Sequence, residues 1–357
     1  MVRELGIGGC ERDLAKLALH LDRSRFTPVV GCFRKEGIRG GELSAAGIHI
    51  VEFPVRSFTS FGALKQAASF WRFLRGEGIA IVHSFDSPSN SFAMPVARLA
   101  GVPGVASRLW SMLAIPPRDR RIARWAEARA RRVVTNARFT MDEAERDGIP
   151  RERLFLNYNG VDTQVFHPRG RERVAPVQGA ELVIGTICAL RQEKRLDLLI
   201  DAFAALRRPG MRLLIVGSGP MEAEYKARVS GHQMEEACHF EPTRNDVAEW
   251  MRSMDVFVLS SDTESFPNAP LEAMACGCAV VGSNVGGVPE MISPGSGRLF
   301  ESQNLDALIS QLRGLLEDPQ LRADLGAGAA RRAEEEFSMG KAARRMEGLY
   351  SSLLGTR

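Results

Sequence analysis

The sequence predicts an α/β protein of two domains, each built on a doubly wound parallel sheet. Short apolar runs alternate with amphipathic helical segments along the chain, and this alternation implies parallel sheets covered by helices on both faces. The length of 357 residues is long for one hydrophobic core and suggests two. The alternation stops once, over residues 162–181, a stretch rich in Pro, Gly and Arg that is typical of an interdomain linker.

The strands are expected where apolar, β-branched runs end in turn residues. We place the first domain at 1–165, the linker at 166–180, the second domain at 181–340 and a terminal helix at 341–357. The expected strands are 26–33, 48–55, 79–85, 104–109, 131–137 and 153–160, then 181–190, 211–219, 238–241, 255–261 and 278–284. Ligands of such sheets bind at the carboxyl ends of strands, so we expect them in a cleft between the domains.

The composition excludes several classes of protein. With 45% hydrophobic and 25% charged residues the chain resembles an ordinary globular protein, and no apolar run reaches the roughly 18 residues of a membrane span. Its first residues are charged where a signal peptide is apolar, and its six cysteines form no CxxC pair. We therefore expect reduced thiols, no metal site and a cytoplasmic location.

The two halves of the chain differ in charge. Residues 1–165 carry 25 Lys and Arg against 17 Asp and Glu, whereas residues 166–357 carry 22 against 26. The net charges are therefore +8 and −4, and we expect the first domain to face the more anionic partner.

Residues 6–21 read as a Gly-rich loop that feeds a helix. Such a loop normally follows a strand, but only a few residues precede it, and they are too charged for a central parallel strand. We therefore expect the first strand to be missing rather than short. Gly8 and Gly9 would let the backbone approach a phosphate closely.

Cations and glycines follow the first two strands of the second domain. Arg191 and Lys194 precede a helix, where they can meet a diphosphate lying across helix N-termini. A solvated helix start is the plain alternative, although positive charge there is mildly unfavourable. Gly217 and Gly219 form a tight turn that lacks the third glycine of a dinucleotide fingerprint, so the signal for NAD is weak.

Two glutamates flank a Phe-Pro-Asn turn after strand 255–261. Glu264 follows the strand at its carboxyl end, where ligands bind. Asn268 is expected to cap the next helix, which places Glu272 in its first turn, where the helix dipole favours a carboxylate. Taken alone, each glutamate could be an ordinary loop or helix-start acid. Gly286 lies on another loop that follows a strand.

The run SSDTESFPNAPLEAMACGCAVVGSNVGGVPEMI, residues 260–292, resembles the donor-binding signature of retaining, family-4-type glycosyltransferases, also called glycosyl transferases group 1, with the GT-B fold. Further matching segments follow in the family's order, so the resemblance covers nearly the whole chain. These segments are 8–21, 81–103, 156–168, 193–203 and 216–220. The resemblance implies two Rossmann-like domains with a ligand cleft between them and a terminal helix that returns to the first domain.

The resemblance also implies roles for single residues. In such enzymes the second Glu of an E-x7-E pair, here Glu272, hydrogen-bonds the ribose of a nucleotide sugar, and the first, here Glu264, lies by the transferred sugar. The implied catalytic residues are Glu264, Arg191 and Lys194, the cations neutralising the diphosphate. The implied donor-binding residues are Glu272, Phe266, Pro267, Asn268, Ala269, Gly217, Gly219, Gly8 and Gly9.

The chemistry of glycosyl transfer is consistent with these residue types. The reaction passes through an oxocarbenium-like state and expels a nucleoside diphosphate, whose charge cations and helix N-termini can stabilise. No DxD metal-binding motif occurs. We therefore expect a retaining hexosyltransferase with no metal or other cofactor, in which the leaving phosphate takes the acceptor proton. The expected partners are a nucleotide-diphosphate sugar and a saccharide or lipid-linked acceptor of cell-surface polysaccharide synthesis.

The chain departs from the family pattern at several places. Ala189 stands where the family usually has Arg, and Pro242 stands where it has Gly in the base-binding loop. His83, Asp86 and Arg108 are candidate acceptor or cleft residues, although His83 fits a structural role equally well. These departures keep a second hypothesis open, that of a catalytically impaired sugar-nucleotide-binding or scaffold protein. A sugar-nucleotide epimerase and a nicotinamide enzyme have weaker support.

Residues 118–134 carry seven Arg against two acids, interleaved with Ile122 and Trp125. This segment is either a membrane-surface helix at the inner face of a membrane or a solvated helix face. Nucleic-acid binding is not expected, because no recognition motif is present. The sequence identifies neither the base and sugar of the donor, nor the acceptor, nor the oligomeric state.

Overall fold

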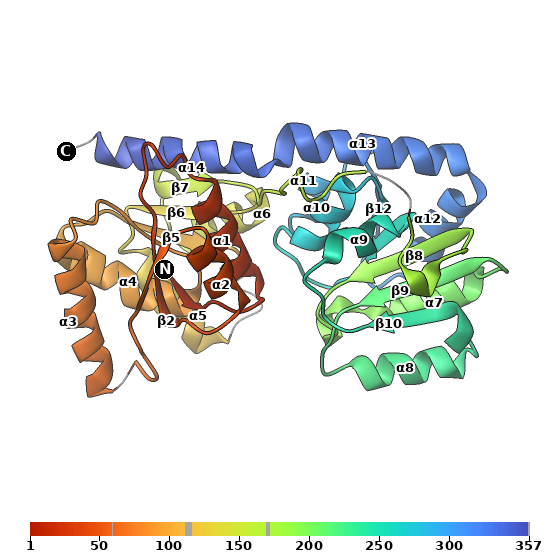
Figure 1. Ribbon diagram of the computed structural model, residues 1–357, viewed down its shortest axis with the longest axis horizontal. Coiled ribbons are helices and arrows are strands. Elements are labelled where there is room, and N and C mark those ends of the chain that lie inside the picture. Colours follow the sequence, from red (N-terminus) through yellow and green to blue (C-terminus); the bar gives the residue numbers. More distant parts are fainter. Residues whose placement is uncertain (59, 111–115, 169–171, 356–357) are drawn as a thin grey trace. The chain divides into compact units, whose positions relative to one another are not determined.

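The computed structural model describes residues 1–58, 60–110, 116–168 and 172–355. The chain folds into two compact units, one of Met1–Gly160 with Met339–Arg357 and the other of Val161–Ser338. Each unit consists of parallel strands flanked by helices (Figure 1), so the predicted fold class is confirmed. No described helix is long and apolar enough to cross a membrane.

The first unit contains parallel strands in the orders β1-β2-β3 and β4-β5-β6-β7. The backbone N–H of Phe85 donates to the carbonyl of Met1 over 2.9 Å, which links the end of β4 to the start of β1. The strands are β1 Val2–Glu4, β2 Val29–Arg34, β3 His49–Glu52, β4 Val82–Ser84, β5 Gly104–Arg108, β6 Arg132–Thr135 and β7 Leu154–Leu156. The helices are α1 Gly9–His20, α2 Ile38–Ala45, α3 Phe61–Gly76, α4 Ser87–Ala100, α5 Pro117–Glu127, α6 Arg138–Arg146 and α14 Met339–Leu354, with a 3-10 turn at Arg151–Arg153.

The expectation of a missing first strand is wrong. Strand β1 exists and pairs with β2, with Val2 opposite Cys32 and Glu4 opposite Arg34. Its charges do not enter the core, because the alternation of a strand buries Val2 and exposes Arg3. Glu4 forms an ion pair with Arg34 on the neighbouring strand.

The terminal helix α14 belongs to the first unit. Its buried residues Met346, Leu349 and Tyr350 share a hydrophobic cluster with Leu14 and Leu17 of α1. This packing follows from apolar residues at helical spacing on both helices.

The stretch expected to be a linker packs on the second unit instead. Val161 donates its N–H to the carbonyl of Phe337, so this unit begins at 161 rather than after 165. Arg173 pairs with Asp255 over 2.8 Å, and Phe166 and Val177 are buried. Residues 169–171 of the expected linker lie outside the described residues.

The second unit has one parallel sheet in the order β10-β9-β8-β11-β12-β13. Its strands are β8 Leu182–Ile187, β9 Met211–Val216, β10 Cys238–Glu241, β11 Val256–Leu259, β12 Ala279–Ser283 and β13 Arg298–Phe300. Its helices are α7 Leu196–Leu206, α8 Glu222–Gly231, α9 Val247–Arg252, α10 Asn268–Ala275, α11 Val288–Met291, α12 Leu305–Glu317 and α13 Pro319–Phe337, with 3-10 turns at Ala175–Val177, Gln192–Lys194 and Glu235–Ala237. Among the described strands, sequence patterns missed two strands of three residues, β1 and β13.

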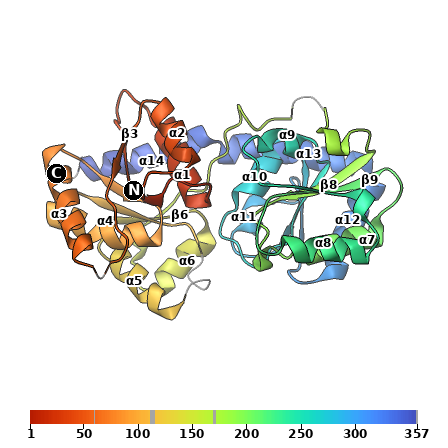
Figure 2. The same ribbon diagram turned by 60° about the horizontal axis from the view of Figure 1, so that its bottom comes forward.

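Helices cover both faces of this sheet. Figure 2 shows α7, α8 and α12 on one face and α9, α10 and α13 on the other. Strands β8, β9 and β11 are buried along almost their whole length, as expected for parallel strands between two layers of helices. The sheet is therefore a rigid base, and the loops at its carboxyl edge are where side chains can meet a ligand.

A completely buried arginine holds the sheet of the first unit to its helices. Arg108, at the end of β5, is 0% exposed and donates to Glu127, the last residue of α5, and over 2.8 Å to Asp147 after α6. The segment 118–134, which was expected to be helical, belongs to two elements, because α5 ends at Glu127 and β6 begins at Arg132. Charged groups buried this deeply are tolerated only when paired.

We predict that Glu127→Gln lowers the free energy of unfolding by about 3–5 kcal/mol, because it leaves the buried Arg108 without its main counter-charge. Glu145→Gln, which breaks the exposed contact with Arg151, is the matched control and should leave stability almost unchanged. Chemical denaturation of both variants measures this difference. Equal effects of the two substitutions would contradict a structural role for the buried pair.

Candidate functional site

Lys194 and Glu264 meet where the strand order of the second unit reverses. Lys194 ends the 3-10 turn that follows β8, and Glu264 lies in the loop between β11 and α10. Strands β8 and β11 are neighbours, and the connections on either side run in opposite directions, which opens a crevice at the carboxyl edge. The Nζ of Lys194 donates to Oε1 of Glu264 over 2.6 Å. The fold thus joins two predicted catalytic residues that lie 70 positions apart.

This ion pair is largely shielded from water. The side chains of Lys194 and Glu264 are 22% and 10% exposed, and the hydroxyl of Ser261 also donates to Glu264 over 2.8 Å. Burial alone would lower the pKa of Lys194, but attraction and hydrogen bonding from Glu264 outweigh it and raise that pKa. Lys194 is therefore a fixed positive charge at neutral pH.

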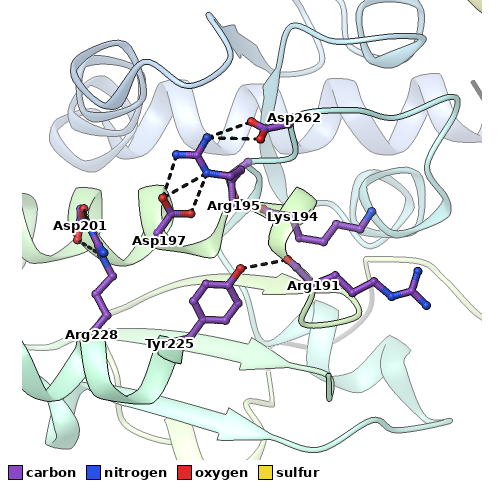
Figure 3. A network of polar contacts seen from close by, with 9 residues as sticks. Arg191, Lys194, Arg195, Asp197, Asp201, Tyr225, Arg228 and Asp262 are labelled. Atoms are coloured by element: carbon purple, nitrogen blue, oxygen red, sulfur yellow. Dashed lines mark hydrogen bonds and ion pairs between the residues drawn. The ribbon is translucent and has the colours of Figure 1, made fainter. Parts of the chain in front are cut away.

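An arginine next to Lys194 in the sequence, Arg195, braces the loop that carries both residues. Arg195 has a left-handed backbone, with φ of 48°, and donates to Asp197 over 2.9 Å and to Asp262 over 3.2 Å (Figure 3). Its hydrogen bond to Asp197 and the charge of both carboxylates raise its pKa further. The N–H of Asp262 also donates to the carbonyl of Glu193 over 2.8 Å.

These contacts fix the loop after β11 against the loop after β8. Neither Arg195 nor Asp262 was predicted from the sequence, because a left-handed residue other than Gly leaves no clear pattern in a single sequence. An Asp two residues before Glu264 was the only available signal.

Arg191 lies on the same loop and is the more accessible cation. Its side chain is 64% exposed, and its backbone carbonyl accepts a hydrogen bond of 3.0 Å from the hydroxyl of Tyr225. In Figure 3 the side chains of Arg191 and Lys194 extend to the same side, away from the Arg195 cluster. The loop therefore presents two positive charges together, as the sequence predicts.

The glycines after β9 allow close contact between two loops. A Cβ on Gly217 would lie 1.9 Å from the carbonyl oxygen of Cys188, and one on Gly219 would lie 2.4 Å from that of Leu190. Packing therefore explains both glycines without a nicotinamide site. Their predicted contact with a donor stays a prediction.

Gly286 supports the loop of Glu264 in the same way. Its φ is 52°, and an added Cβ would lie 1.7 Å from the carbonyl oxygen of Glu264. The N–H of Gly287 donates to the carbonyl of Ser265 over 2.8 Å. The position of Glu264 thus depends on a residue without a side chain 22 positions later.

Helix α10 begins differently from the expectation. Pro267 occupies the N-cap position with an extended backbone, and Asn268 is the first helical residue. The expected Asn268 cap is therefore wrong, and Glu272 lies in the second turn, too far from the helix end for the dipole to explain it. Glu272 is only 1% exposed, so it is no solvated helix acid. The predicted donor contacts Phe266, Pro267, Asn268 and Ala269 all lie at this helix start.

The acceptor candidates are engaged in the structure of the first unit. His83 contacts the hydroxyl of Tyr350 through Nδ1 over 2.6 Å and that of Ser107 through Nε2 over 2.7 Å, and burial lowers its pKa well below the ordinary value. Asp86 caps α4 by accepting from the N–H of Ser89 over 2.7 Å. The proposal of Arg108 as a cleft residue is wrong, because its guanidinium is fully buried. His83 has these structural contacts and also lines a small cavity of the first unit, so its role toward an acceptor stays a prediction.

Gly8 and Gly9 open α1, with Gly8 at its N-cap, so they lie in a loop between a strand and a helix as expected. Their contact with phosphate stays a prediction. Within the described residues, no three His, Cys, Asp or Glu side chains are grouped so that they could hold a metal ion.

We predict that Gly286→Ala destabilises the second unit, with the left-handed backbone alone costing roughly 1 kcal/mol. Displacement of the Glu264 carbonyl adds to this cost, because a backbone atom cannot rotate away. Gly295→Ala is the control, since an added Cβ there meets nothing within 4 Å. Denaturant titration measures both variants, and an unfolding free energy for Gly286→Ala equal to that of the control would contradict the contact.

Comparisons with known proteins agree with this geometry. Residues 7–165 match the model of "Glycosyltransferase Family 4" and residues 172–332 match that of "Glycosyl transferases group 1". The chain is 30% identical over 210 residues to N-acetyl-alpha-D-glucosaminyl L-malate synthase of Bacillus anthracis, covering 57% of this chain and 55% of that protein. It is 28% identical over 210 residues to the lipopolysaccharide core biosynthesis mannosyltransferase LpsB of Rhizobium meliloti, covering 55% and 60%. The matches thus span little more than half the length of these curated relatives.

Solved structures show the same fold. HepE of Anabaena, in complex with UDP and glucose, aligns with a TM-score of 0.86 and 22% identity over 98% of this chain and 99% of that one. A glycosyltransferase from Rickettsia africae aligns with a TM-score of 0.86 and 17% identity over 100% and 98%. The two family models together take in about nine-tenths of the residues. The chain therefore belongs to the group 1 and family 4 glycosyltransferases, with the GT-B fold.

Proposed function

We propose that this chain is a retaining glycosyltransferase that moves a hexose from a nucleotide-diphosphate sugar to a saccharide acceptor without a metal ion. The observation that carries this proposal is the shielded pair of Lys194 and Glu264 at the reversal of strand order, with Glu272 buried on the helix that follows. HepE of Anabaena, which has the same fold, has a crystal structure in complex with UDP-glucose. That complex supports a nucleotide sugar as the donor class.

In this proposal a carboxylate holds the ribose of the donor and two cations hold its diphosphate. Glu272 accepts hydrogen bonds from the ribose hydroxyls, and the start of α10 contacts the sugar through the backbone at Phe266, Pro267 and Asn268. Lys194 and Arg191 face the diphosphate, which replaces part of the contact between Lys194 and Glu264 in the free protein. Gly217 and Gly219 border the nucleotide on the neighbouring loop.

In the transfer step, the bond formed, the bond broken and the proton transferred are all accounted for by the donor and the acceptor. The bond from the anomeric carbon to the diphosphate oxygen breaks, the acceptor oxygen bonds to that carbon on the same face, and the acceptor proton passes to the leaving phosphate. Lys194 and Arg191 stabilise the negative charge that develops on the diphosphate. Glu264 lies by the sugar, where its carboxylate stabilises the developing positive charge of the ring.

The acceptor binds to the first unit, which is basic, since residues 1–165 carry a net charge of +8. Helix α5 exposes Ile122 and Trp125 beside Arg118, Arg121 and Arg124, which favours contact with an anionic membrane surface. We therefore propose a lipid-linked saccharide of cell-surface polysaccharide synthesis as the acceptor, used at the cytoplasmic face of a membrane. Lipopolysaccharide relatives such as LpsB support this class.

A specific departure favours a second candidate. Ala189 lies on the loop of Lys194 at the position where the family usually has a third cation, so the diphosphate meets one charge fewer. A sugar-nucleotide-binding protein with little transferase activity is the function that this change supports. Tight donor binding without transfer would distinguish it from the enzyme.

We predict that one of UDP, GDP and ADP raises the stability of the wild-type protein by about 2.7 kcal/mol at a hundredfold excess over its dissociation constant. NAD should have no effect. Glu272→Ala should lose this gain relative to its own unliganded state, whereas Glu249→Ala, an exposed acid on α9, should keep it. Thermal unfolding with each nucleotide measures the shifts. A full gain in Glu272→Ala would contradict the ribose contact.

We predict that transfer is unchanged by EDTA, since side-chain cations and not a metal neutralise the leaving group. Lys194→Ala should lower kcat/KM by about a hundredfold or more, whereas Lys226→Ala, which removes an exposed cation on α8, should have little effect. NMR of the product should show the anomeric configuration of the donor. A requirement for divalent metal, or an inverted product, would overturn the proposed mechanism.

A further inference from the structure

Five arginines line an open hollow in the first unit, at the sheet edge where its strands begin. The hollow has a volume of about 650 Å³ and lies where α4 ends, where α5 ends and where β5, β6 and β7 start. Its arginines are Arg98, Arg129, Arg131, Arg132 and Arg153. This edge is opposite the carboxyl edge of the same sheet, where α/β folds hold their substrates, so the proposed transferase chemistry makes no use of it.

No carboxylate within the described part of the chain forms an ion pair with these five arginines. Their hydrogen bonds go to backbone carbonyls instead: Arg129 donates to Trp125 over 2.7 Å, and Arg153 donates to Ala128 over 3.0 Å. Elsewhere in the described chain, some arginines, such as Arg151, are matched by nearby acids, and others, such as Arg207 and Arg298, also donate only to carbonyls. The hollow differs in that five such arginines line one space.

The charge balance of the lining is clearly positive. Five guanidinium groups line the hollow, the carboxylate of Glu152 acts on Arg153, and the C-terminal ends of α4 and α5 are each equivalent to about half a negative charge. The lining is therefore positive by about three charges. Arg153 neutralises the end of α5, since it also donates to the carbonyl of Glu127 over 3.1 Å. The positive charge of the other four arginines exceeds the partial negative charge of the helix ends.

The arginines repel one another in the free protein. Burial lowers the pKa of Arg153, and the nearby charges of Arg132, Arg98 and Arg131 lower it further. Like charges gathered without counter-ions cost free energy, which a bound anion would recover. Arg129 is also held in place, because its guanidinium lies 3.8 Å from the ring centre of Trp125.

We propose that this hollow is a binding site for a phosphate-bearing anion, separate from the nucleotide-sugar site. Guanidinium groups match phosphate oxygens through paired N–H donors, and several of them together favour a group with more than one negative charge. The volume suits a diphosphate or a phosphorylated headgroup better than a single inorganic ion. The source is either a soluble phosphate compound or a phospholipid headgroup.

Calorimetric titration with inorganic pyrophosphate at low salt tests this site. Arg98→Gln with Arg131→Gln removes two exposed side chains of the hollow and leaves the structural Arg153 in place. This double variant should bind pyrophosphate about tenfold or more weakly. Arg313→Gln with Arg331→Gln, two exposed arginines of the second unit, is the control for the loss of charge and should bind like the wild type.

Lys194→Ala separates this proposal from the donor site. Pyrophosphate binding that persists in Lys194→Ala and is lost in the hollow variant supports the proposal. Binding lost in Lys194→Ala and kept in the hollow variant would place the anion at the donor site and overturn it, as would absence of binding to the wild type. Because Lys194 belongs to the other unit, failure here leaves the transferase proposal intact.

Vesicles distinguish the two sources of the phosphate group. Flotation with phosphatidylglycerol vesicles, compared with phosphatidylcholine vesicles, should show binding that the hollow variant loses if a headgroup is the ligand. Pyrophosphate binding without a difference between the two vesicles indicates a soluble ligand. Equal flotation of the wild type and the hollow variant, together with equal pyrophosphate affinity, would refute the site for both sources.

Discussion

The arrangement of the second unit depends on the reversal of strand order between β8 and β11. At this point two loops leave the sheet in opposite directions, and the ion pair of Lys194 and Glu264 joins them over 2.6 Å. A salt bridge shielded from water is strong only when its loops are already fixed, because the desolvation of both charges must be offset. The braces around the pair supply that fixed geometry.

Those braces are mainly backbone contacts. Gly286 lets its loop touch the carbonyl of Glu264, and Gly217 and Gly219 do the same for the loop of Lys194. Arg195 adds a charged clamp between Asp197 and Asp262. Lys194 is thus held in place by the fold itself, and a charged group that is already fixed can stabilise a developing charge without reorganisation.

The first unit uses similar residue types for a different purpose. His83, Asp86 and Arg108 are candidates for chemistry from the sequence, and each also makes contacts within the fold, with Arg108 completely buried. Five arginines without a carboxylate partner among the described residues gather at the opposite edge of the sheet, in the arginine-lined hollow. Residue type alone therefore does not separate structural from ligand-binding groups, and the number of partners a side chain has is the better guide.

The sequence by itself determined the fold class, most strands and the family, because apolar periodicity and the 260–292 signature are local patterns. It also placed Glu264, Arg191 and Lys194 on loops after strands. Only the tertiary structure decided that Lys194 contacts Glu264, that Glu272 is buried in a second helical turn, and that Arg108 is internal. These outcomes depend on contacts between residues far apart in the chain, and side-chain partners chosen at such distances leave no trace in a local pattern.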